Sequence, residues 1–156
     1  MKTTTKKIKY LFSFGKGLTI TKANLSDSGV PCVSYGQVHS KYGVILNTDI
    51  HELPFVPISY LESSPQSLIG QGDFVFADTS EDKAGSGNFT CLVNDDKIFA
   101  GYHTIIMRPV STEVNYKYFA YLFDSQDFRR QIQESVSGIK VFSIPQSLLK
   151  NAEAFY

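Results

Sequence analysis

Short apolar runs separated by polar turns occupy the first two thirds of the chain. The runs are rich in aromatic and β-branched residues and cover residues 30–38, 42–46, 74–77, 89–93, 97–100 and 104–108. Such runs are typical of β-strands, because these side chains fit a pleated surface. Asn94-Asp95-Asp96 lies between two of the runs and indicates a hairpin. Residues 78–88 are polar and contain Gly85 and Gly87, which predicts an exposed loop.

The spacing of apolar residues becomes helical in the last third of the chain. They recur mainly at helical intervals, at Tyr118, Tyr121, Leu122, Phe128, Ile132 and Val136. This spacing predicts helices over residues 115–123 and 126–137, with Ser125 as an N-cap and Gly138 just beyond the second helix. A further helical turn is expected after Ser143-Ile144-Pro145, and a last strand over residues 153–156.

The start of the chain fits two interpretations. Residues 7–14 carry Ile8, Leu11, Phe12 and Phe14, which suit either a short helix or a strand, and Gly15-Lys16-Gly17 then predicts a turn. Strands followed by a helix pair indicate an α+β fold, a mixed or antiparallel sheet-rich domain with a C-terminal pair of short helices. We expect one domain over residues 1–156.

The composition allows a real core and narrows the class of protein. Hydrophobic residues make up 42% of the chain, which favours a folded domain over disorder. Cys32 and Cys91 lack the close spacing of metal ligands or of a redox pair, so we expect buried, reduced thiols. No apolar stretch suits a signal peptide or a membrane span, which predicts a cytoplasmic protein with no membrane partner.

The formal net charge of zero conceals a polarised chain. Residues 1–41 hold seven lysines and one acid, Asp27, whereas residues 42–156 hold eight basic and fourteen acidic residues, so the balances are +6 and −6. A neutral total argues against strong non-specific binding to nucleic acid, which depends on neutralising phosphates. The basic start is either a solvated segment or a set of phosphate contacts.

Signatures of catalysis are incomplete. Gly15-x-Gly17 lacks the third glycine of a dinucleotide fingerprint, and Lys16 is not followed by the Ser or Thr of a Walker A loop. Asp78, Glu81 and Asp82 form an acidic cluster that suits either a Mg²⁺-dependent nuclease or a solvated turn. We expect no cofactor and no metal, with the nuclease kept as an alternative.

Four segments follow one another along almost the whole chain. The first pairs Gly15-Lys16-Gly17-Leu18 with a strand over residues 29–33, and the second is Gly72-Asp73 before an apolar strand. The third is the strand over residues 100–109, which ends in Arg108-Pro109, and the fourth is the helix pair with its closing segment to residue 148. Together they resemble the target-recognition domain of specificity subunits from type I restriction-modification systems.

That resemblance implies a DNA-reading component without an active site. Specificity subunits of this family carry two such domains joined by long helices, and this chain ends at Tyr156, where such a helix would begin. We therefore expect one recognition domain that reads half of a bipartite site in double-stranded DNA. Its partners would be the methyltransferase subunits and the restriction subunit, and pairing with a second copy stays open. The alternative is a protein-interaction adaptor without DNA specificity.

The resemblance also directs attention to particular side chains. Polar and basic groups on the expected loops at residues 35–42 and 79–88, together with the lysine of the glycine turn, are candidates for contacts with DNA, because such groups bond to base edges and phosphates: Lys16, Gln37, His39, Ser40, Lys41, Tyr42, Ser80, Lys83, Ser86 and Asn88. Candidates for phosphate contacts are Lys6, Lys7 and Lys9. His103 is interpreted as a hydrogen-bonded structural residue, and Arg108 as a helix cap or the partner of an acid.

Overall fold

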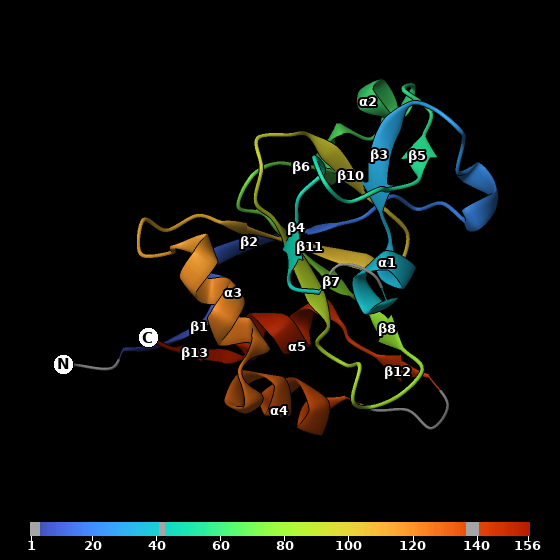
Figure 1. Ribbon diagram of the computed structural model, residues 1–156. Helices are drawn as coiled ribbons and strands as arrows, with labels where there is room; N and C mark the ends of the chain where they lie inside the picture. The colour runs from blue at the N-terminus through green and yellow to red at the C-terminus, as the bar shows by residue number, and fades with distance from the viewer. Residues whose placement is uncertain (1–3, 41–42, 137–140) are drawn as a thin grey trace.

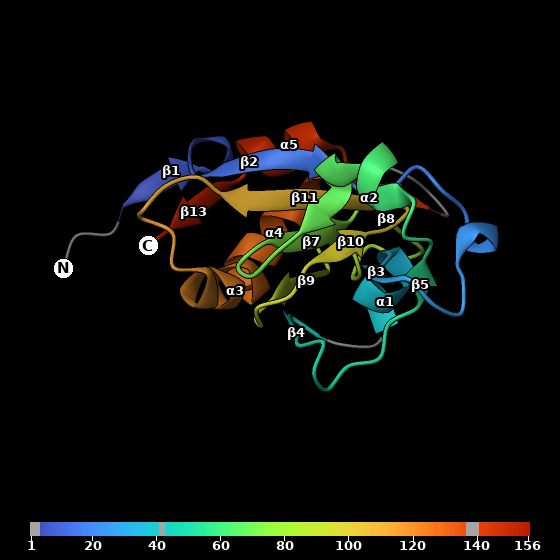
Figure 2. The same cartoon turned by 90° about the horizontal axis from the view of Figure 1, so that it is seen from above.

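The computed structural model describes residues 4–40, 43–136 and 141–156, except the side chain of Ser40 (Figure 1). Its largest element is a mixed five-stranded sheet in the order β2-β11-β7-β9-β4, which crosses the molecule in Figure 2. Its strands are β2 (Phe12–Lys16), β4 (Ile45–Leu46), β7 (Phe74–Ala77), β9 (Phe89–Leu92) and β11 (Thr104–Pro109). Neighbours are antiparallel except β4 and β9, which are parallel.

Side chains of the central strand alternate between two hydrophobic cores. Phe74 and Phe76 of β7 face a core shared with the C-terminal helices, whereas Val75 and Ala77 face a second core. The period of two follows from the pleat of the strand, and both faces are buried. The sheet is therefore the middle layer of the fold.

Helices cover the first face of the sheet. They are α3 (Tyr116–Asp124), α4 (Gln126–Ser135) and α5 (Gln146–Asn151). Asn115 caps α3 by accepting from the backbone N–H groups of Lys117 and Tyr118, and Ser125 caps α4 as the sequence predicts. Gly138, the expected C-terminal signal, lies outside the described residues. The helix pair that the spacing predicted is confirmed, and α4 ends at Ser135.

A second sheet covers the other face. Its order is β5-β3-β10-β6, with β3 parallel to β10. The strands are β3 (Val30–Val33), β5 (Phe55–Val56), β6 (Leu68–Ile69) and β10 (Ile98–Ala100). The hairpin expected around Asn94-Asp95-Asp96 is wrong, because β9 and β10 belong to different sheets. β10 is buried on both sides: Ile98 and Ala100 face the large sheet, and Phe99 faces a third cluster with Cys32.

The conformation of residues 35–40 differs from the one that the sequence predicted. The strand expected over residues 30–38 ends at Val33, and a short helix, α1 (Tyr35–Ser40), replaces the expected loop. The Gln37 side chain accepts a hydrogen bond of 2.8 Å from the backbone N–H of Ser34, which is half of a capping box. The spacing Ser34-x-x-Gln37 is the signal that predicts this helix start.

The beginning of the chain forms strands with a single 3-10 turn between them. β1 (Thr5–Lys7) precedes the turn η1 (Ile8–Tyr10), and β1 pairs antiparallel with β13 (Glu153–Phe155), the last strand that the sequence predicted. Gly15 and Lys16 pair with β11, so the expected turn begins only at Gly17. A Cβ at Gly17 would lie 2.0 Å from the Gly101 carbonyl oxygen, which explains the glycine there.

The remaining described elements are short. They are η2 (Lys22–Asn24), α2 (Tyr60–Ser63), η3 (Pro65–Ser67), and the two-stranded ladder of β8 (Thr79–Ser80) with β12 (Phe142–Ser143). Cys32 and Cys91 are both free and buried, and burial raises their thiol pKa values to about 11 and about 12. Within the described ranges, no helix has the length and apolar character needed to cross a membrane.

Candidate nucleic-acid interface

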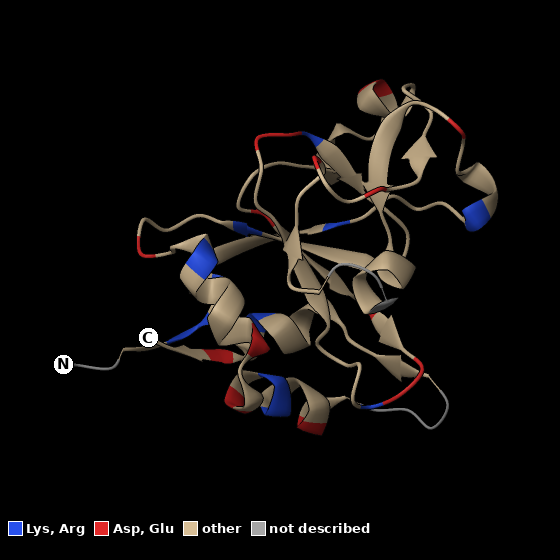
Figure 3. Ribbon diagram, viewed as in Figure 1, with Lys and Arg blue, Asp and Glu red and all other residues tan. Residues whose placement is uncertain are grey.

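Charged residues are spread over the molecule instead of gathering on one face (Figure 3). Basic residues occur on β1, β2, α3 and α4, and acidic residues are common in the connecting segments. With a net charge of zero, any contact with DNA phosphates must come from local groups of cations.

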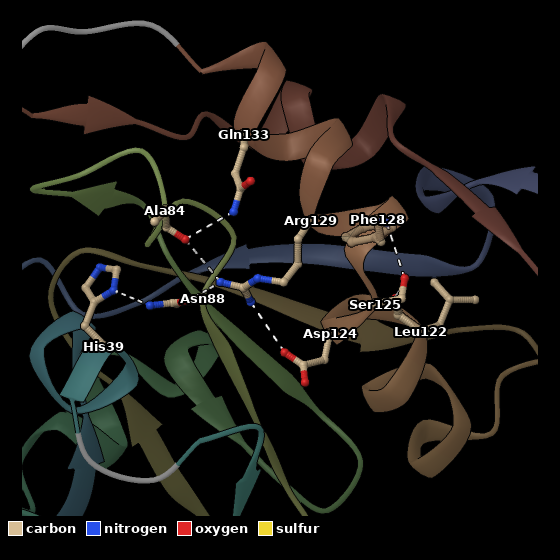
Figure 4. A network of polar contacts seen from close by, with 9 residues as sticks. All are labelled: His39, Ala84, Asn88, Leu122, Asp124, Ser125, Phe128, Arg129 and Gln133. Carbon is tan, nitrogen blue, oxygen red and sulfur yellow. Dashed lines mark hydrogen bonds and ion pairs between the residues drawn. The ribbon is translucent and has the colours of Figure 1, made fainter.

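The structure brings together the two segments proposed from the sequence. The His39 imidazole on α1 lies 2.7 Å through Nε2 from the carbonyl oxygen of Thr79. Its Nδ1 lies 2.9 Å from Nδ2 of Asn88 (Figure 4). One histidine therefore joins α1 to both ends of the segment over residues 79–88.

An arginine on α4 fixes the orientation of this contact. The Arg129 guanidinium can only donate, and it donates to the Asn88 side-chain oxygen. The Asn88 amide nitrogen must then face His39, so Nδ1 of His39 accepts and Nε2 carries the proton that it donates to Thr79. Arg129 and Gln133 also donate to the carbonyl oxygen of Ala84, at 3.4 and 3.2 Å (Figure 4).

This network gives several sequence candidates a structural role. Ser86 is completely buried and Ser80 is 4% exposed, so neither hydroxyl is accessible to a base. The segment is therefore not the wholly exposed loop that its polar composition predicted. His39 and Asn88 are half-buried and hold the segment in place, and Gln37 caps α1.

Other candidates are accessible or lie outside the described part. Lys83 is exposed within the segment 79–88, and Lys16 is exposed at the end of β2. Lys41, Tyr42 and the side chain of Ser40 lie outside the described residues. The surface around α1 and residues 79–88 thus presents Lys83 beside the exposed acids Glu81 and Asp82.

The N-terminal lysines differ in their surroundings. Lys6 lies 2.5 Å from Glu113, whose pKa is lowered by hydrogen bonds from Lys6 and from the Tyr156 hydroxyl. Lys7 and Lys9 are exposed, with the Lys9 ammonium 5.3 Å from the centre of the Tyr10 ring. Lys7 and Lys9 are therefore the better candidates for phosphate contacts.

The acidic cluster takes part in local contacts. Asp78 lies 3.1 Å from Nδ1 of His103, and Asp82 accepts a hydrogen bond of 2.6 Å from the backbone N–H of Gly85. Across residues 4–40, 43–136 and 141–156, no group of three or more His, Cys, Asp or Glu residues is arranged to hold a metal ion. Asp78 is therefore engaged by His103, and Asp82 stabilises a local turn.

His103 makes the kind of hydrogen bond that the sequence interpretation expected, and its exposure also makes it a candidate for contact with DNA. It has a positive φ of 56°, and its side chain is 57% exposed although Asp78 holds its Nδ1. The Tyr35 ring packs edge-on against it at 5.2 Å between ring centres. The result is an outward imidazole on a turn of fixed geometry between β10 and β11. Nothing in the sequence pattern marks a positive φ at this position.

Two of the four segments that carry the family resemblance contact each other directly. Arg108 donates through Nε to Asp73 at 3.1 Å, and through Nη2 to the carbonyl oxygen of Leu68 at 2.9 Å. Asp73 also accepts from the backbone N–H of Gly70. The Gly-Asp turn and the Arg-Pro strand end therefore form one ion-paired unit, as the interpretation of Arg108 as the partner of an acid anticipated.

No family model and no curated protein matches this sequence. Solved structures do match its fold. The S subunit of a type I restriction-modification system from M. genitalium superposes with a TM-score of 0.62 at 17% identity, over 99% of this chain and 34% of that one. The HsdS subunit of Thermoanaerobacter tengcongensis gives 0.64 at 10% identity, over 98% and 32% of the two chains.

A third chain comes from a structure described as the basis of complex assembly and conformational transition in a type I restriction-modification system. It gives a TM-score of 0.65 at 12% identity, over 98% of this chain and 33% of that one. At these identities the likeness shows the fold alone. The resemblance and the α+β class expected from the sequence are confirmed at that level, and the chain spans about a third of the length of these structures.

Proposed function

We propose that this chain is a target-recognition domain that binds double-stranded DNA in a sequence-dependent way and has no catalytic role. The observation that carries the proposal is its structural likeness to type I S subunits over 98–99% of its length. In this proposal, residues 1–156 form one recognition domain that acts in the cytoplasm. Fold alone does not determine function, so the surface must also suit DNA.

The surface supports the proposal through rigid elements that present polar groups. The network of His39, Asn88 and Arg129 ties the segment with Lys83 to α1 and α4, and the contact with Asp78 fixes the exposed His103 side chain. Base reading needs donors and acceptors in fixed positions, because a bidentate contact tolerates little displacement. We assign base contacts to Lys83, His103 and the segment 40–42, and phosphate contacts to Lys7 and Lys9.

The proposed partners follow from the same likeness. A recognition domain without chemistry of its own acts by directing methyltransferase subunits, and through them a restriction subunit, to half of a bipartite site. Exposed aromatic side chains on α3, Tyr118 at 50% and Tyr121 at 80%, offer a surface for a protein partner. Phe119 and Phe123 on the same helix are buried, so the core and the proposed partner surface occupy different faces of α3.

A selection from randomised duplexes tests the proposal. The purified chain, alone and with candidate methyltransferase subunits, is incubated with the duplex pool near physiological salt, and bound DNA is sequenced. Enrichment of one short motif supports DNA reading and identifies the half-site. A folded chain that enriches nothing in either condition would instead support the adaptor, for which the exposed aromatics of α3 are the candidate surface.

A further inference from the structure

A groove with a mixed polar and apolar lining runs along β2, at the edge of the five-stranded sheet. One wall is β2 with the residues that follow it, and the other is the segment from α2 to η3. The groove has a volume of about 420 Å³ and a floor that includes Leu18 and Ile106. Eight of its lining side chains carry hydrogen-bonding groups: Ser13, Lys16, Thr19, Tyr60, Ser64, Gln66, Ser67 and Arg108.

The charge of this lining is of one sign. Lys16 and Arg108 contribute cations, and no carboxylate is among the lining residues in the described part of the chain. Asp73 neutralises part of the Arg108 charge, but its side chain is 8% exposed whereas that of Arg108 is 46% exposed. The groove therefore presents the guanidinium and covers the carboxylate. Lys150 lies close by, with its ammonium 5.4 Å from the centre of the Phe14 ring, which also lines the groove.

Hydrogen bonds hold the backbone that carries Lys16 and the side chain of Arg108 in place. The Ser67 hydroxyl donates to the Lys16 carbonyl oxygen at 2.8 Å, and the Gln146 amide donates to that of Gly15 at 3.2 Å. Arg108 is held by Asp73 and by the Leu68 carbonyl. Because these contacts exist before any ligand binds, little ordering is required on binding.

We propose that this groove binds the sugar–phosphate backbone of one DNA strand, with Lys16 and Arg108 on phosphates and Ser13, Thr19 and Gln66 donating hydrogen bonds. Arginine, lysine, hydroxyl and amide groups are those that proteins use on phosphates and sugars. The inference rests on the proposed DNA-binding function and deepens it by assigning the groove, Gln66 and Arg108 to the non-specific part of the contact.

The test measures the salt dependence of DNA binding for the full chain. Two fluorescein-labelled duplexes of unrelated sequence are each titrated at about 50 and about 200 mM salt with the wild-type chain, Lys16→Ala and Gln66→Ala. Lys117→Ala on α3 is the matched control, because Lys117 is also exposed but lines a different hollow beside Asp124. Lys16 and Gln66 are both exposed, so their removal leaves the core intact.

We expect the salt dependence of DNA affinity to decrease in Lys16→Ala and to stay unchanged in Lys117→Ala. Each phosphate contact contributes a slope of about 0.9, so in Lys16→Ala the ratio of affinities at the two salt concentrations falls by about 3.5-fold. Gln66→Ala weakens binding to all sequences with its slope unchanged, and Lys117→Ala behaves as wild type.

Three outcomes would overturn the inference. Wild-type binding with an unchanged salt ratio in Lys16→Ala refutes the groove and leaves the proposed function standing. A loss in Lys16→Ala confined to one DNA sequence makes Lys16 a base-reading residue instead. A folded wild-type chain that binds no duplex at either salt concentration removes the proposed function and the groove together.

Discussion

Removing the Arg129 guanidinium tests whether the segment over residues 79–88 is held from α4. In Arg129→Met the side chain keeps most of its length and loses every donor. Asn88 then loses the partner that fixes its amide, and His39 loses the oriented contact that joins α1 to the segment. We expect local loosening of the segment together with a measurable loss of global stability.

The magnitude follows from the contacts that Arg129 makes. Its bond to Asn88 is a hydrogen bond from a charged group, which contributes about 1.5–3 kcal/mol. The pair with Asp124, at 3.6 Å and with that carboxylate 52% exposed, adds at most about 0.5 kcal/mol. The bond to Ala84 is long at 3.4 Å and adds little. Arg129→Met should therefore lower the free energy of unfolding by about 2–3 kcal/mol.

Urea unfolding and amide hydrogen exchange measure the two effects. The loss should appear as a lower urea midpoint with an unchanged slope, and the amides of Gly85, Ser86 and Asn88, which bond within the segment, should exchange faster. The control is Arg130→Met, because Arg130 is adjacent on α4 and exposed. Equal midpoints and equal exchange rates in the two variants would refute the reasoning.

Phe123→Ala should lower the free energy of unfolding by about 3–5 kcal/mol in urea. The ring lies 4.8–5.9 Å from six other phenylalanine rings; an effect under about 1 kcal/mol would contradict a packed aromatic core. His103→Val should be less stable than His103→Gly by about 1–2 kcal/mol, because only glycine accepts a positive φ freely; equal midpoints would show that the turn relaxes. Burial raises the pKa of both thiols in the folded chain, so ionisation of the cysteines has no effect on the free energy of unfolding below pH 9.0. Above pH 9.0 the thiols ionise first in the unfolded chain, and the free energy of unfolding falls as the pH rises toward about 11 and about 12. Cys91→Ala should flatten that fall, and a wild-type stability constant over this range would disprove it.

The strands with continuous apolar runs could be predicted from the sequence, but their partners could not. β7 and β11 are marked by apolar runs, and both exist near the expected bounds. β9 and β10 were also marked, yet their separation into two sheets depends on where Phe99 finds a buried site, beside Cys32 and Val56. Local turn chemistry carries no information about such a distant contact. In α1, by contrast, the signal Ser34-x-x-Gln37 was present and was outweighed by the apolar residues around it.

The candidate site could likewise be predicted only in part from the sequence. Polar loops after strands were a reasonable source of DNA contacts, but composition does not distinguish a side chain that faces water from one that supports the backbone. Ser86 is polar and completely buried, and Asn88 is turned toward Arg129, which lies 41 positions further along the chain. Lys16 and Gln66 meet in one groove only because β2 and η3 pack together, which is a property of the tertiary structure.

The pairing of β1 with β13 has a consequence for the order of folding. Lys6 is opposite Ala154, so this ladder joins segments separated by nearly the whole chain. Closing so long a loop costs more conformational entropy than closing any hairpin, and contacts of this kind form late and slow the overall rate. We therefore expect a nucleus built from β7, β9 and β11, with the β1–β13 ladder forming last. Substitutions in β1 should then speed unfolding while leaving the refolding rate almost unchanged.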